Sequence, residues 1–172
     1  MSHHVPTATR SPQREIPAHG IGEKEMAWAW LRFARATVEA KVAGLGDEPL
    51  ARHLVPSPTT LAGILAHLTT VEQHWFSNVL GGQSLTMPFD EDLPDGDWVT
   101  DGVGVATLLA RYRGACAGSD EVIGALAMAD TGAQETGNYT LRWALFHVLG
   151  DTMRHAGQAD ILREQTDGFC GW

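Results

Sequence analysis

Apolar residues recur at three- and four-residue intervals in four separate stretches of the chain, which is the spacing of an amphipathic helix. The predicted helices cover about 23–42, 58–80, 103–128 and 141–165. Ser57 and Pro58 suit the start of the second helix, as its N-cap and its first helical residue. Thr140 suits the N-cap of the last helix, and Gly168 suits its end. In the third helix the pattern leaves open a break near Gly118.

Four helical stretches without a strand pattern or an internal repeat predict an all-α fold, a four-helix bundle. The bundle is expected to occupy residues 23–172 as one domain. Residues 1–22 show no period and are expected to form a flexible N-terminal arm. Residues 83–100 are expected to form a long crossover loop between helices 2 and 3. The acidic run 90–97 within it does not reproduce the calcium loop of an EF-hand, so we interpret it as a solvated loop.

Composition narrows the classes of partner. The chain has 172 residues and a formal net charge of −9, which argues against a nucleic-acid partner because that partner requires a basic surface. No apolar run reaches the length of a membrane span, and no secretion signal precedes the helices. The two cysteines, Cys116 and Cys170, form no metal-binding or disulfide pattern, so both are expected to be free thiols in a cytoplasmic protein.

The best candidate for chemistry is a row of polar residues in the last helix. His147, Asp151 and His155 follow one another at intervals of four residues. Residues at this spacing are neighbours on a helix surface, so two of them can bind one metal ion. All three extend over about 12 Å of helix, which is too far for one ion to bind both ends. The spacing alone does not choose between the pairs 147/151 and 151/155.

A third ligand would come from another helix, as in bundles that build metal sites in their cores. His67 is the best candidate because it lies among apolar residues of the second helix. The alternative is a core histidine whose hydrogen bonds are satisfied without a metal. His74 lies two turns later and could line the same pocket or face solvent.

Several motifs together carry a resemblance to a known family. They are Thr60 to Leu68 (TLAGILAHL), Val71-Glu72 with Trp75-Phe76, Leu141-Arg142-Trp143, and Arg154-His155-Ala156-Gly157. With these motifs the chain resembles the DinB-like superfamily over about residues 23–171, in particular its actinobacterial branch often labelled DUF664. The resemblance implies a four-helix bundle of the DinB-like type.

The resemblance also implies a ligand set for a divalent metal ion such as Zn, Ni or Fe. By position in the motifs, the ligands are His67, Asp151 and His155, and His147 becomes a pocket residue one turn before them. The chain departs from the usual pattern of its branch at two positions. Asp151 stands where Glu is common, and Gln158 stands where His is common.

Related members include S-transferases that use the small thiols mycothiol or bacillithiol. The expected function is therefore a metal-dependent, mycothiol-type S-transferase that acts on a small-molecule electrophile, since a bound metal ion stabilises the reactive thiolate. Alternatives are a metalloenzyme of another class, such as a lyase, isomerase, hydrolase or cyclase, or a non-catalytic metal-binding bundle. Trp75 and Trp143 are expected to wall the pocket, and relatives that dimerise suggest a homodimer. No catalytic group besides the metal ligands is assigned.

Overall fold

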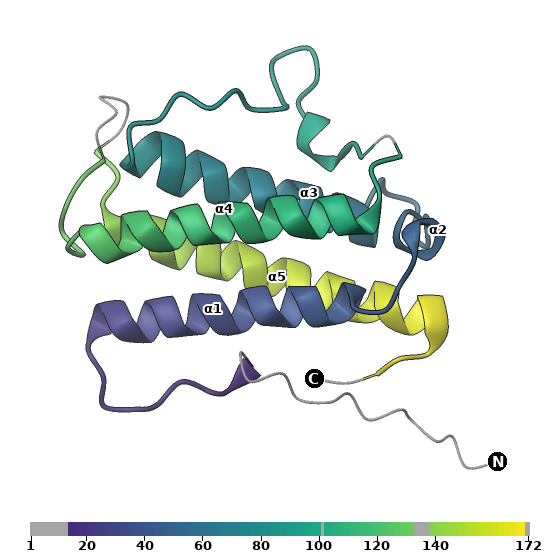
Figure 1. Ribbon diagram of the computed structural model, residues 1–172, viewed down its shortest axis with the longest axis horizontal. Helices are drawn as coiled ribbons and strands as arrows, with labels where there is room; N and C mark the ends of the chain where they lie inside the picture. The colour runs from purple at the N-terminus through teal and green to yellow at the C-terminus, as the bar shows by residue number, and fades with distance from the viewer. Residues whose placement is uncertain (1–13, 101, 133–137, 171–172) are drawn as a thin grey trace.

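A computed structural model describes residues 14–100, 102–132 and 138–170, and its main elements are four long helices (Figure 1). They are α1 (Glu23–Val42), α3 (Leu61–Glu72) continued by the π-helix η2 (Gln73–Leu80), α4 (Val105–Ala125) and α5 (Leu141–Asp167). Two short elements, α2 (Asp47–Leu50) and the 3-10 helix η3 (Gly96–Trp98), lie in the connections. Within the described ranges, strand-type pairing is limited to one bridge between Thr131 and Thr140. The predicted all-α bundle is confirmed.

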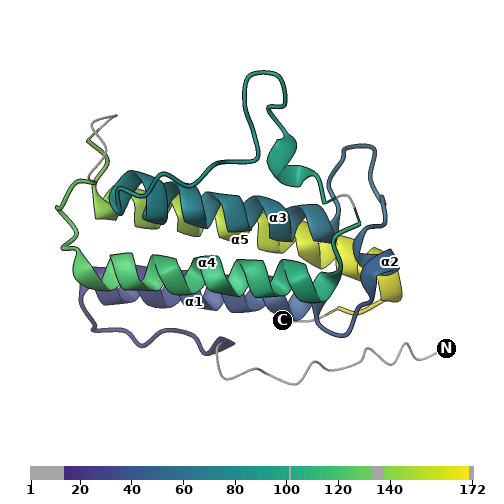
Figure 2. The ribbon, with the colours of Figure 1, turned by 45° about the horizontal axis from the view of Figure 1, so that its top comes forward.

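The helices are paired in parallel, with a long connection that crosses the bundle. In Figures 1 and 2, α1 and α5 lie side by side and run in one direction, while α3 and α4 lie side by side and run in the other. The chain between Leu80 and Val105 therefore returns along the length of the bundle before α4 begins, as the crossover prediction requires. Because α3 and α5 are antiparallel neighbours, the start of α3 lies beside the later turns of α5.

The predicted start of the second helix is wrong by three residues. Thr60, in extended conformation, is the N-cap, and its hydroxyl accepts the backbone N–H of Gly63 at 2.9 Å. Ser57 is not the cap because residues 58–60 are not helical; its hydroxyl donates a hydrogen bond to that of Thr59 instead. The helix reaches Leu80 as predicted, but it changes to π-helical hydrogen bonding at Gln73.

The ends of the other helices agree closely with the prediction. The hydroxyl of Thr140 caps α5, and Gly168 ends it in the left-handed conformation with φ of 75°. α4 continues without a break through Gly118, and it begins at Val105 and ends at Ala125, a few residues inside the predicted limits. The short helix α2 was not predicted.

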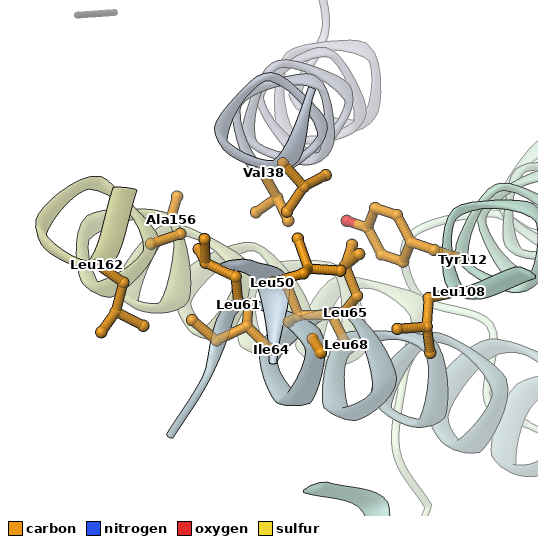
Figure 3. Packing of buried hydrophobic residues seen from close by; sticks show 13 residues of the cluster. Val38, Leu50, Leu61, Ile64, Leu65, Leu68, Leu108, Tyr112, Ala156 and Leu162 are labelled. Atoms are coloured by element: carbon orange, nitrogen blue, oxygen red, sulfur yellow. The ribbon is translucent and has the colours of Figure 1, made fainter. Parts of the chain in front are cut away.

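Two clusters of buried apolar residues form the core. The cluster nearer α2 takes residues from every helix of the bundle, among them Val38, Leu65, Leu108 and Leu162 (Figure 3). The other cluster lies at the opposite end and centres on Leu31, Phe76, Ile123, Leu141 and Leu145. Together they fix the positions of α3 and α5, whose remaining faces carry the candidate site.

Three further predictions concern the N-terminal arm, the two cysteines and the absence of a membrane span. Of the predicted arm, residues 1–13, with His3 and His4, lie outside the described residues, and 14–22 precede α1. Cys116 is half-buried, Cys170 is exposed, and both are free thiols. In the described part of the chain, every helix is too short or too polar to cross a membrane.

Candidate metal centre

The structure brings together three residues that can bind a metal ion. His67 comes from α3, and Asp151 and His155 come from α5 one turn apart. One ligand atom from each residue lies within 4.8 Å of the other two. His155 is buried, whereas His67 and Asp151 are partly exposed. The cluster therefore lies at the edge of the bundle interface, where a small molecule could reach it.

The ring of His67 is held from both sides. Its Nδ1 lies 2.6 Å from Oδ2 of Asp97, and its Nε2 lies 3.3 Å from Oδ2 of Asp151. Because Asp97 accepts a hydrogen bond from the Nδ1–H, the Nε2 atom is the one directed toward the cluster. Asp97 comes from η3, and its side chain is buried.

The ring of His155 is held in the same sense. Its Nδ1 lies 2.6 Å from Oε1 of Gln158, and its Nε2 lies 3.5 Å from Oδ1 of Asp151. An amide oxygen can only accept, so Gln158 takes the Nδ1–H and leaves Nε2 for the cluster. The two carboxylate oxygens of Asp151 thus face one imidazole each.

The pKa values of Asp151 and His67 are shifted from their ordinary values. Burial alone raises the pKa of Asp151, but hydrogen bonds from His155 and His67 outweigh it, and the pKa of the carboxyl lies well below its ordinary value. Burial lowers the pKa of His67, but its hydrogen bonds with Asp151 and Asp97 outweigh that effect and raise the pKa overall. Asp151 is therefore ionised at neutral pH and ready to bind a cation.

Trp98 covers one side of the cluster. Its ring stacks on that of His67 with centroids 4.4 Å apart, and it meets the ring of His155 edge-on at 5.3 Å. The backbone of η3 approaches α3 closely at Gly63, where an added Cβ would lie 3.3 Å from Trp98. Gly63 therefore permits the contact that places both Asp97 and Trp98.

The prediction of a solvated loop at 90–97 is wrong for its last residues. Gly96 and Asp97 are buried, and a Cβ at Gly96 would lie 1.9 Å from the carbonyl oxygen of Pro88. A tight turn at Gly96 thus packs the loop onto the bundle. The acidic composition of the run gives no indication that one of its residues, Asp97, pairs with His67.

The other predicted site residues form a separate aromatic cluster. The ring of His147 stacks on that of Trp143 with centroids 4.7 Å apart, and Trp75 contacts both. The ring of His74 meets that of Trp75 edge-on. Burial lowers the pKa of His74, and the nearby His147 lowers it further. In this cluster Trp143 and His147 lie two turns and one turn before Asp151 on α5, whereas His74 and Trp75 belong to η2. The three-residue group does not include His147.

Sequence reasoning missed Asp97 and Trp98 and assigned Gln158 no role. Gln158 has a local signal, because it lies three residues after His155 on the same helix face. For the loop residues the only signal is a tryptophan directly after an aspartate in an otherwise polar segment. Neither spacing nor composition connects that dipeptide to His67, which lies thirty positions earlier.

Comparison with known proteins adds the family. A family model described as mycothiol-S-transferase matches residues 27–168, which is most of the chain. The chain belongs to the mycothiol S-transferase family. The DinB-like resemblance is thereby confirmed.

Structural comparison supports the fold of this mycothiol S-transferase family member. The crystal structure of a conserved protein from Enterococcus faecalis aligns with a TM-score of 0.69 at 13% sequence identity. The alignment covers 87% of this chain and 99% of that chain. No curated protein matches the sequence. At this identity the solved structure establishes a shared architecture, and the chemistry must be argued from the site.

Proposed function

We propose that this protein is a metal-dependent S-transferase of the mycothiol type and that His67, Asp151 and His155 hold its divalent ion. The observation that carries the proposal is the orientation of the two histidines. Each has an acceptor on Nδ1, Asp97 for one and Gln158 for the other, so each presents Nε2 to the same carboxylate. Metal-binding histidines use this arrangement, in which an outer hydrogen bond fixes the ring and its tautomer.

The donor set suits a catalytic ion. Two imidazole nitrogens and one carboxylate oxygen match the ligand types that bind Zn, Ni or Fe, and three protein ligands leave positions open for substrate. The short side chain of Asp151 is long enough here, because its two oxygens lie 3.3 Å and 3.5 Å from the two Nε2 atoms. The replacement of the usual Glu by Asp is therefore compatible with metal binding.

A bound divalent ion would supply the positive charge that keeps a thiol ionised at neutral pH. In the proposed reaction the thiol releases its proton to water, its sulfur forms a bond to an electrophilic carbon, and the leaving group departs with the electron pair of the broken bond. Trp98 limits the access of water on one side of the ligands. His147, Trp75 and Trp143 are proposed to line the pocket beside them.

Metal content and thiol consumption test the proposal together. Protein purified without an affinity tag is expected to contain about one divalent ion per chain and to consume mycothiol in the presence of chloroacetamide. Asp151→Asn removes the charge at nearly constant shape and is expected to abolish both. His53→Ala is the matched control, because His53 is an exposed histidine in the α2–α3 connection.

Two results would contradict the proposal. One is thiol consumption that persists unchanged after metal removal and in Asp151→Asn. The other is a metal-loaded protein that is indifferent to thiols but converts another substrate, which would indicate a metalloenzyme of a different class.

A further inference from the structure

A row of aromatic residues continues the line of the metal ligands along α5. Tyr139, Trp143 and His147 precede Asp151 and His155 at the same interval of four residues. The ring of Trp143 stacks on that of His147 at an interplanar angle of 15°, and Tyr139 contacts Trp143 with centroids 4.6 Å apart. The first turns of α5 therefore present the rings of Trp143 and His147 on one face, and the ring of Tyr139, just before the N-cap Thr140, packs against Trp143.

Trp75 supports this row from the neighbouring helix. Its ring centroid lies 5.1 Å from that of Tyr139, 4.6 Å from that of Trp143 and 4.9 Å from that of His147. Trp75 belongs to the π-helical segment η2. Such segments are rare and often occur at functional sites, since the changed register redirects side chains.

A shallow hollow, wide open to solvent, lies beside these rings on the surface of α5. It has a volume of about 570 Å³ and is lined by Thr140, Arg142, Trp143, Phe146 and His147. Trp143 is 42% exposed and Phe146 is 51% exposed. Large aromatic side chains that stay exposed around a hollow next to a candidate active site are typical of ligand contact.

The charges around the hollow narrow the class of ligand. Arg142 is the one cation among the lining residues, and both oxygens of Glu23 accept hydrogen bonds from its guanidinium. The hollow therefore offers no uncompensated positive charge to a carboxylate. Its rings instead favour an uncharged planar group, which can stack or pack edge-to-face on them.

The position of the hollow sets the length of that ligand. His147 and Trp143 lie four and eight residues before Asp151, which corresponds to about 6 Å and about 12 Å along the helix. A molecule with a ring in the hollow and a reacting carbon at the ligands needs a linker of a few bonds between them.

We propose that the hollow binds an uncharged aromatic group of the electrophilic co-substrate, joined to the reacting carbon by a short linker. This inference rests on the proposed function, because it assigns the electrophile of that reaction.

Three chloroacetamides that share one reacting group test the class of ligand. They are chloroacetamide, its N-benzyl derivative and its N-cyclohexylmethyl derivative. In each reaction with mycothiol a C–S bond forms, the C–Cl bond breaks, chloride leaves with the electron pair, and the thiol proton goes to water. We expect the N-benzyl compound to show a kcat/KM at least tenfold above those of the other two.

Substitutions locate the effect. Phe146→Ala is expected to reduce kcat/KM for the N-benzyl compound about tenfold and to change that for chloroacetamide less than twofold. Ile161→Ala is the matched control, because Ile161 is an exposed apolar residue of α5 that does not line the hollow. Equal reactivity of the benzyl and cyclohexylmethyl compounds would overturn the proposal, as would equal effects of Phe146→Ala on all substrates.

A binding measurement separates this inference from the proposed function. N-benzylacetamide has no leaving group, and calorimetry without thiol should show it binding to the wild-type protein and to Ile161→Ala but not to Trp143→Ala. Binding of this kind without turnover of any chloroacetamide would reject the S-transferase reaction and retain the aromatic site. Turnover of the chloroacetamides without such binding would retain the reaction and reject the site.

Discussion

The carboxylate of Asp97 lies 2.6 Å from Nδ1 of His67, although the two residues are thirty positions apart and the first belongs to a loop. This contact fixes the ring of His67 and leaves Nε2 for the cluster. Outer hydrogen bonds to metal-binding histidines commonly contribute a factor of ten to one hundred in affinity.

Asp97→Ala is therefore expected to lower the affinity for Zn²⁺ by about tenfold to about one hundredfold. Asp97→Asn keeps an acceptor oxygen and should lose less. Competition with a chromophoric chelator measures both affinities. Asp95→Ala is the control, because Asp95 is an exposed acid of the same loop with the same formal charge. If Asp97→Ala and Asp95→Ala have equal affinities, Asp97 contributes only its charge.

Gln158 offers a parallel test on the second histidine. Gln158→Leu removes the oxygen that accepts the Nδ1–H of His155 at 2.6 Å and should weaken Zn²⁺ binding by about tenfold. Gln158→Glu keeps an acceptor and should retain the affinity of the wild-type protein. Gln165→Leu, an exposed position on the same helix, controls for the loss of an amide. Unchanged affinity in Gln158→Leu would show that packing alone orients His155.

The helices, and the row of three candidate ligands on the last of them, could be predicted from the sequence for a physical reason. Apolar periodicity and the caps Thr140 and Gly168 are local signals, and a four-residue interval fixes which side chains are neighbours on a helix. The choice of Asp151 with His155, and the addition of His67, needed the family resemblance. Spacing within one helix cannot say which of its turns faces a second helix.

The remainder of the site depends on how a loop packs, which local signals do not determine. Asp97 reaches His67 because Gly96 turns tightly against Pro88 and because Gly63 lets η3 approach α3. From the sequence alone, residues 90–97 are interpreted as an acidic, solvated loop. A buried hydrogen bond between distant elements becomes visible only when the packing is known.

Metal binding should depend on pH with a definite sign. In the metal-free protein, hydrogen bonds with Asp151 and Asp97 more than offset burial and raise the pKa of His67 above the ordinary 6.5. A proton on Nε2 competes with the ion, so the affinity for Zn²⁺ should fall as pH decreases through this pKa, by about tenfold per pH unit below it. Calorimetric titration from about pH 6 to about pH 8 measures the profile. An affinity that does not change over this range would contradict the assignment of His67 as a ligand.

In the metal-free protein, His67 should make the stability of the fold decrease as pH rises, which is opposite in sign to the pH dependence of metal binding. Because the pKa of His67 is raised on folding, its contribution to stability is complete below pH 6.5 and is lost as pH rises through the raised value. Urea unfolding in the presence of a chelator should therefore show lower stability at pH 8 than at pH 6, and His67→Ala should reduce this difference. If the difference is the same in His67→Ala, another group causes it.

Removing one partner of the buried ion pair between α1 and α3 is expected to destabilise the bundle strongly, because the other charge is then left buried. Glu72 accepts two hydrogen bonds from Arg35, each at 2.7 Å, and both side chains are buried. Among the described residues, Glu72→Gln leaves the guanidinium with Asp120 as its ionised partner, and the substitution should lower the free energy of unfolding by about 3 kcal/mol. Glu48→Gln makes the same chemical change in an exposed pair with Arg52 and should cost less than about 1 kcal/mol. Urea unfolding measures both, and equal losses would show that burial does not strengthen the Arg35 pair, because the two substitutions differ mainly in their exposure to solvent.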